Sequence, residues 1–115
     1  MRLTIHLVLA FVVCVLWACG GATVPTSSTA STQAAIRAAQ EVGAERVPQA
    51  ALHLRYARDE VSDAQRLEED GEEERAVLVL RRAEADAELA IALARAHAAE
   101  EEADAAERQA AELQR

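Results

Sequence analysis

The sequence predicts an all-α protein, an antiparallel helical hairpin with a long C-terminal helix and a short preceding helix. Alanine, the residue with the highest helix propensity, occupies 28 of the 115 positions. Beyond residue 25, the helix-breaking residues are Gly43, Pro48 and Gly71, which divide this part of the chain into three segments. Tyr56 is the single aromatic residue after Trp17, so a β-sheet core is not expected.

Length and charge exclude several classes of protein. A chain of 115 residues has room for one small domain. Twenty acidic residues against 12 basic ones give a net charge of -8, and every basic residue is arginine. Because the sequence has no basic patch and no aromatic platform, we do not expect nucleic acid as a partner.

The N-terminal residues resemble a secretory signal. Arg2 precedes an uncharged apolar run, residues 7–18, of 12 residues. Spanning a bilayer takes about 20 residues, whereas the hydrophobic region of a signal peptide takes about 7 to 15. We therefore expect residues 1–18 to be a signal peptide that is removed from the mature protein.

The residues that follow, Leu16-Trp17-Ala18-Cys19, resemble the lipobox of bacterial lipoproteins. The resemblance implies cleavage before Cys19 and three acyl chains on that residue, although Trp17 departs from the small residue usual at its position. Two or more chains hold a protein firmly on a membrane. Gly20, in place of an aspartate, implies a lipid anchor in the bacterial outer membrane, with the protein facing the periplasm.

Two other interpretations of this segment are open. The apolar run could continue from Leu3 to Val24 as an uncleaved anchor. Cys14 and Cys19 could instead form a disulfide, but Cys14 lies in the segment expected to be removed and no cysteine follows Cys19.

The first helical segment follows an uncharged stretch. Residues 19–31 are rich in Gly, Ser, Thr and Ala, a composition typical of a flexible tether, here lipidated. Ser31 or Thr32 offers a side-chain oxygen as an N-cap, and Gly43 ends the helix. We expect a helical domain over residues 32–115.

The second and third segments have matching apolar stripes. The second begins at Val47-Pro48 and ends near Asp70, and its stripe has the helical spacing of four and three residues: Ala50, Leu54, Ala57, Val61 and Ala64. The third runs from Glu72 to Arg115 with the stripe Leu80, Ala83, Ala87, Ala90 and Ala94. Beyond it, the same alternation continues in Ala96, Ala99, Ala103, Ala106, Ala110 and Leu113.

The short turn at Gly71 predicts an antiparallel hairpin between these segments. At about 1.5 Å per residue, the second helix is roughly 34 Å long and the third reaches about 60 Å. Either the first helix completes a three-helix bundle, or the overhanging part of the third helix pairs with another chain in a coiled-coil-like arrangement. Because large apolar residues are few, we expect an envelope protein partner or a homo-oligomer to supply stability.

An acidic cluster surrounds Gly71 and is the candidate partner contact. It consists of Glu68, Glu69, Asp70, Glu72, Glu73 and Glu74. A solvated turn, a docking site for a basic partner and a metal site are three interpretations. The spacing fails the calcium-loop pattern because Arg66 and Val77 stand where the first and last ligands belong, so no metal ligand is assigned.

Residues with potential for chemistry do not form a known catalytic pattern. His97 has Glu100 and Glu101 at helical spacing, which is more typical of a solvated helix face than of a metal site. No paired-histidine, phosphate-loop or serine-nucleophile motif occurs. We therefore expect no enzymatic activity and no cofactor.

The order of small residues over about residues 32–95 resembles the bacterial lipoprotein family known as domain of unknown function 4398. The residues that carry the resemblance are Ala39, Pro48, Ala50, Ala57, Ala64, Gly71, Ala83, Asp86, Ala87, Glu88 and Ala90. It implies a lipid-anchored, helical, periplasmic protein with no established activity. The leading expectation is a non-enzymatic envelope scaffold or adaptor. The alternative is a lipoprotein that binds a ligand or a divalent metal at the acidic turn.

Overall fold

The structure, a computed structural model, describes residues 26–115, with side chains from residue 28. Its elements in chain order are helix α2 (Thr26–Glu41), the 3-10 helix η1 (Ala44–Arg46), α3 (Pro48–Glu69) and α4 (Glu73–Leu113). The described residues contain helices and no strands, which confirms the all-α fold. The predicted signal peptide and Cys19 lie outside the described residues.

Helices α3 and α4 form the predicted antiparallel hairpin, and their facing stripes make the core. All ten stripe positions predicted over the two helices are buried, and Ala76 extends the α4 stripe by one turn. Leu54 and Leu80 are the largest apolar side chains that are fully buried. Alanine seams allow helix axes to approach to about 8 Å, so this core is close-packed but contains little apolar volume.

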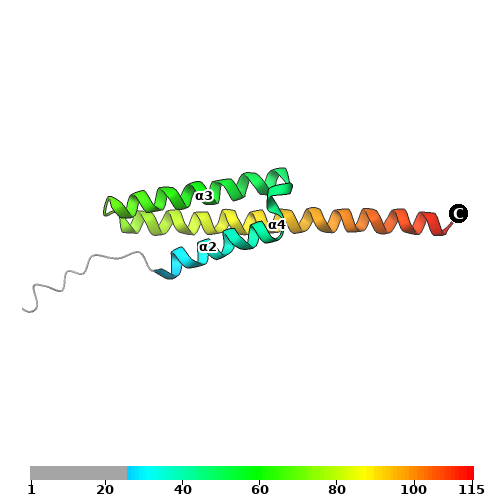
Figure 1. Cartoon of the computed structure of the whole chain (residues 1–115), viewed down its shortest axis with the longest axis horizontal. Coiled ribbons are helices and arrows are strands. Elements are labelled where there is room, and N and C mark those ends of the chain that lie inside the picture. Colours follow the sequence, from blue (N-terminus) through cyan, green and yellow to red (C-terminus); the bar gives the residue numbers. More distant parts are fainter. Residues whose placement is uncertain (1–25) are drawn as a thin grey trace, which may run out of the picture.

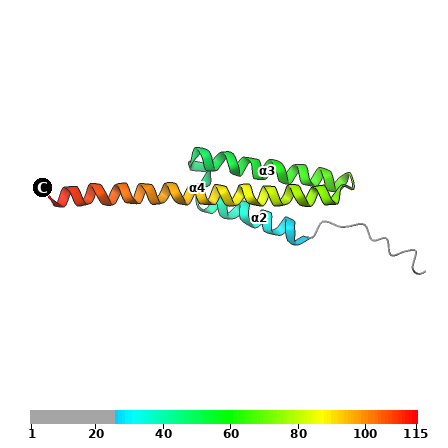
Figure 2. The same ribbon diagram turned by 180° about the vertical axis from the view of Figure 1, so that it is seen from behind.

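Helix α2 packs against α4 and completes a three-helix bundle. Figures 1 and 2 show α3 along one side of α4 and α2 along another. Ile36 and Ala39 of α2 are buried in the same core cluster as the hairpin stripes. This is the first of the two predicted arrangements, in which the short helix before the hairpin completes a three-helix bundle.

Helix α2 begins at Thr26, earlier than the predicted cap at Ser31 or Thr32, so residues 26–31 are helical and not part of an extended tether. Thr32 is fully buried inside the helix. Its hydroxyl donates to the carbonyl oxygens of Ser28, at 2.9 Å, and Leu80, at 3.2 Å. A threonine within a helix can bond to the preceding turn in this way, and here the bond also ties α2 to α4.

Two left-handed glycines separate the helices. Gly43 has a φ of 79° and precedes η1, after which Val47 is extended and Pro48 starts α3 at the first helical position. Gly71 has a φ of 76° in the turn between α3 and α4. Both residues adopt a conformation that side chains with a Cβ rarely take, so the predicted breaks occur where the backbone requires glycine.

The C-terminal part of α4 extends beyond the bundle as a single helix (Figure 1). Ala94 is the last buried residue, and all residues from Arg95 to Arg115 are exposed. We call residues 95–113 the overhang. Among the described helices, none combines the length and hydropathy needed to cross a membrane.

Candidate functional site

The acidic turn lies at the end of the bundle where α3 passes into α4. The Gly71 amide donates to the Glu68 carbonyl at 3.1 Å, and the Glu72 amide donates to the Leu67 carbonyl at 2.8 Å. This pair of bonds is a Schellman motif, which satisfies backbone carbonyls at the end of α3. The motif explains how a helix can end in acidic residues although their charge is unfavourable at a helix C-terminus.

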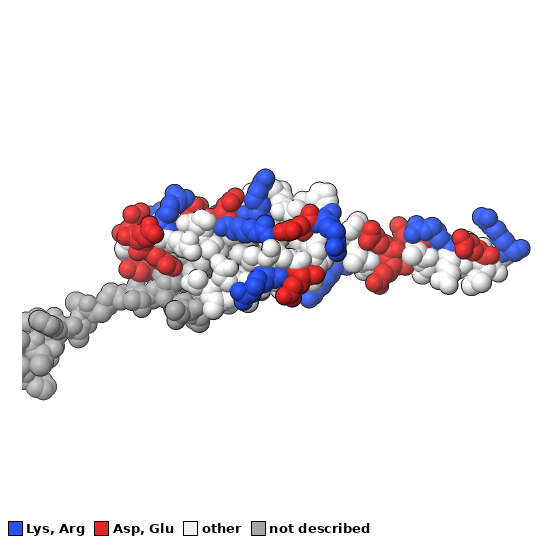
Figure 3. Space-filling view, in the orientation of Figure 1, with Lys and Arg blue, Asp and Glu red and all other residues white. Residues whose placement is uncertain are grey.

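The six predicted contact residues are brought together at this end, where Figure 3 shows a dense patch of acidic side chains. Glu69, Asp70 and Glu74 are exposed, and Glu68, Glu72 and Glu73 are partly exposed. A shallow hollow of about 330 Å³ is lined by residues 71–75. The turn is thus a compact, negatively charged surface.

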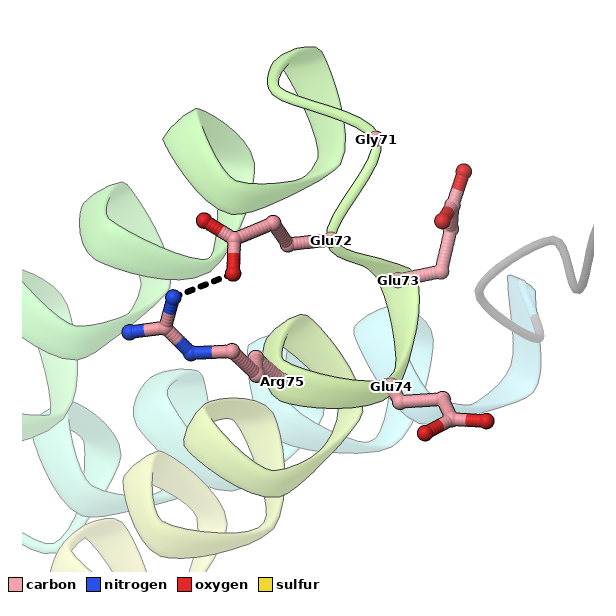
Figure 4. A pocket seen from close by; sticks show the side chains of 5 residues that line it. All are labelled: Gly71, Glu72, Glu73, Glu74 and Arg75. Atoms are coloured by element: carbon pink, nitrogen blue, oxygen red, sulfur yellow. Dashed lines mark hydrogen bonds and ion pairs between the residues drawn. The ribbon is translucent and has the colours of Figure 1, made fainter.

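The carboxylates at the start of α4 do not converge on one point. Glu72 points toward Arg75 and forms an ion pair with it, whereas Glu73 and Glu74 extend in different directions (Figure 4). In the part of the chain that the structure describes, no three or more His, Cys, Asp or Glu side chains are grouped as metal ligands would be. The geometry therefore favours a charged contact surface over a chelating site.

A second polar cluster, which the sequence did not predict, joins α3 to α4. His53 Nδ1 lies 2.7 Å from Asp86 Oδ1, and Arg82 Nε lies 2.6 Å from Glu60 Oε1. The ring of Tyr56 meets that of His53 edge to face at 5.9 Å. These contacts flank the alanine core and fix the relative axial position of the two helices.

Glu60 is the perturbed acid of this cluster. Burial raises the pKa of Glu60, the nearby Arg82 guanidinium partly offsets this, and the negative charge of Asp86 raises the pKa further. Its second carboxylate oxygen, Oε2, is buried without a hydrogen-bond partner among the described residues. The arrangement places an acid of raised pKa beside a shallow groove lined by Tyr56, Val79 and Arg82, among others.

His97, a candidate from the sequence, lies on the exposed overhang, where its Nε2 is 3.6 Å from Glu101 Oε1. The Ser62 hydroxyl donates to the Arg58 carbonyl of its own helix at 3.3 Å. Cys19, the predicted lipidation site, lies outside the described residues.

The helical region matches a known family. The family model described as Domain of unknown function (DUF4398) matches residues 27–106, more than half of the chain. The chain belongs to this family. The DUF4398 match begins in α2, includes the acidic turn and the polar cluster between α3 and α4, and reaches into the overhang. Comparison with curated proteins and with solved structures found no match.

Proposed function

We propose that this chain is a non-enzymatic, lipid-anchored protein of the bacterial cell envelope, acylated at Cys19 in the outer membrane, and that it acts as a scaffold or adaptor in the periplasm. The observation that carries the proposal is the relation between the two ends of the described chain. Helix α2 starts at the same end of the bundle as the acidic turn, while the overhang points away from it (Figures 1 and 2).

This geometry suits a tethered scaffold. Residues 19–25 span at most about 25 Å, so an anchor at Cys19 holds the turn end of the bundle near the membrane. The overhang, about 28 Å of helix at 1.5 Å per residue, then projects away from the anchor. Three acyl chains make such an attachment effectively permanent.

The polar side chains of the bundle support a non-catalytic role. His53 and Glu60 are paired with Asp86 and Arg82 in contacts between helices, and Ser62 is bonded to its own backbone. A nucleophile needs a base within hydrogen-bond reach, and these contacts do not supply one for Ser62. The acidic turn supports an adaptor function because it offers a charged surface to a basic partner.

Phase partitioning of envelope extracts tests the anchor. We expect Cys19→Ser to move the protein from the detergent phase to the aqueous phase, because the acylated thiol is lost. Cys14→Ser is the matched control and should leave the distribution unchanged, because residue 14 belongs to the removed segment. Mass spectrometry of the isolated wild-type chain should give the three-chain adduct on residue 19, and an unmodified sulfur there would refute the anchor.

A further inference from the structure

We propose that the outward face of α4 is a self-association surface through which two copies of this chain pair as an antiparallel coiled coil. The surface, which we call the outer stripe, has eleven positions spaced alternately four and three residues apart: Leu78, Arg82, Ala85, Leu89, Ala92, Ala96, Ala99, Ala103, Ala106, Ala110 and Leu113. All eleven are exposed, and the three leucines are 63%, 42% and 83% exposed. The inference goes beyond the proposed function and does not require acylation.

The outer stripe points away from the bundle. Each of its positions from Leu78 to Ala96 lies two residues beyond a position of the buried seam, which places it about 200° further around the helix. The buried seam ends at Ala94, and its register continues through His97, Glu101 and Asp104, which are exposed. The outer stripe keeps Ala or Leu through the overhang, so the apolar heptad pattern belongs to the outward face.

The charged member of the outer stripe does not interrupt it. Arg82 lies toward α3, where its Nε is 2.6 Å from Glu60 Oε1. The guanidinium is therefore directed to the side of the stripe and is neutralised within the chain. The long aliphatic part of an arginine can cover apolar surface beside it.

The flank of the outer stripe shows what would cover it. From Arg82 to Ala103, the residue before every second stripe position is charged, and the charges alternate in sign: Arg81, Glu88, Arg95 and Glu102. All four are exposed. A row of four alternating charges is complementary to the same row read in the opposite direction, so the best-matched partner is a second, antiparallel copy.

One antiparallel register places opposite charges together and also places large side chains against small ones. It places Arg81 opposite Glu102 of the second copy and Glu88 opposite Arg95 of the second copy. The same register sets Leu78 against Ala103 and Leu89 against Ala92, so that large and small side chains alternate across the seam. Alanine at most layers lets the axes approach to about 8 Å.

Other registers are less favourable. A shift of seven residues places Arg95 opposite Arg95 of the second copy and Glu88 opposite Glu102, which brings like charges together. A shift of fourteen residues matches Arg81 with Glu88, but it sets Leu78 against Leu89 and leaves the overhang uncovered.

In an in-register parallel pair, the charged flank would face the opposite edge of the stripe. There Arg95 would meet Glu100, but Glu102 would meet Glu107, and Asp86 is already bound by His53.

The antiparallel register also accounts for the overhang. Residues 87–108 of one copy would lie along residues 73–94 of the other, so each overhang packs against the partner's bundle. The surface between Leu78 and Ala103 covers about 37 Å of helix. Burial of this apolar face would add to a core that contains few large side chains.

Cysteine cross-linking between two tagged chains tests the pairing. The background is the full chain with Cys14→Ser and Cys19→Ser, purified in detergent, so the result is independent of acylation. One chain carries Leu78→Cys and the other Ala103→Cys. We expect a disulfide-linked heterodimer only when the two are mixed, because like positions lie about 37 Å apart in the antiparallel pair.

Two outcomes would overturn the proposal. A disulfide dimer of the Ala103→Cys chain alone, as abundant as the mixed product, would indicate parallel pairing. No cross-link in any sample, together with a monomer in sedimentation equilibrium, would show that the outer stripe does not bind a second copy.

Charge exchange on the same background gives an independent measurement. Arg95→Glu should weaken dimerisation about tenfold, because two attractive pairs become repulsive. Adding Glu88→Arg should restore the dissociation constant to within about threefold, since the exchanged charges meet again. Arg108→Glu, the same change on the other face of the overhang, should have no effect, and an equal loss in both single variants would contradict the specific register.

Discussion

The two parts of α4 have the same helical conformation but differ in what covers their inner face. In the bundle, positions such as Leu80, Ala83 and Ala87 are buried under α2 and α3. In the overhang, the same face presents His97, Glu101 and Asp104, all exposed. The bundle therefore ends where the inner seam becomes polar, whereas the helix continues because no breaker occurs before its end.

This contrast separates helix formation from tertiary packing. The overhang is held by backbone hydrogen bonds, high alanine content and exposed pairs such as His97 with Glu101. An isolated helix of its length is marginal in water, so its order depends on continuation from the bundle. The bundle, in contrast, depends on side-chain contacts. Substitutions in the two parts should therefore change the free energy of unfolding by very different amounts.

The largest difference is expected between two leucines of α4. Leu80→Ala should lower the free energy of unfolding by about 2 to 5 kcal/mol, because it removes one of the largest buried side chains and leaves a cavity. Leu113→Ala makes the same change in the overhang and should stay within about 0.5 kcal/mol. Urea unfolding followed by circular dichroism, at one fixed chain concentration, measures both. Similar losses in the two variants would mean that the overhang is as tightly packed as the bundle.

The helices of the hairpin could be predicted from the sequence for a simple physical reason. The alternation of four and three residues is a direct projection of helix geometry, and the glycines occur where the backbone needs a positive φ. The start of α2 could not be predicted in the same way. Hydroxyl residues are typical of linkers and helix caps, whereas Thr32 lies inside α2, where its hydroxyl bonds to Leu80 of α4, far away in sequence.

Substitution of Thr32 tests that contact. Thr32→Val keeps the shape of the buried side chain but removes the hydroxyl that bonds to Ser28 and Leu80, so we expect a loss of about 1 to 2 kcal/mol in the free energy of unfolding. Ser31→Ala also removes a hydroxyl that bonds to α4, at Glu84 Oε2, but water can replace this exposed bond, so the variant should cost less than about 0.5 kcal/mol. Amide hydrogen exchange should also show lower protection of α2 in Thr32→Val than in Ser31→Ala. Equal exchange in the two variants would mean that the buried Thr32 hydroxyl holds α2 on α4 no more strongly than the exposed Ser31 hydroxyl does.

The two candidate sites also differ in how far they could be predicted from the sequence. The acidic residues around Gly71 were visible in the sequence because they are adjacent in the chain. The directions of their side chains were not, and the Glu72 pair with Arg75 depends on the geometry of the first turn of α4. The contacts of His53 and Glu60 depend on the axial register of α3 and α4. The sequence contains only a weak signal of that register, namely the charged residues beside both core stripes.

The smallest expected effect is a pH dependence from Glu60, a residue of the bundle with no counterpart in the overhang. Burial raises the pKa of Glu60 above 4.5, its usual value, so the folded protein binds this proton more tightly than the unfolded chain does. The stabilisation from protonated Glu60 is complete below the unfolded pKa and is lost as pH rises through the folded pKa. The wild-type free energy of unfolding should therefore contain a component that falls with pH in the window above 4.5.

Glu60→Gln isolates this component because glutamine cannot ionise. The difference in unfolding free energy, variant minus wild type, should rise as pH increases through that window, measured by urea unfolding at a series of pH values. Glu112→Gln, on the exposed overhang, corrects for the loss of one negative charge from the chain as a whole. A difference that falls with pH would mean that the attraction of Arg82 outweighs burial and that ionised Glu60 stabilises the hairpin. The sign of the slope thus decides whether the contact between α3 and α4 acts mainly as an ion pair or as a buried acid.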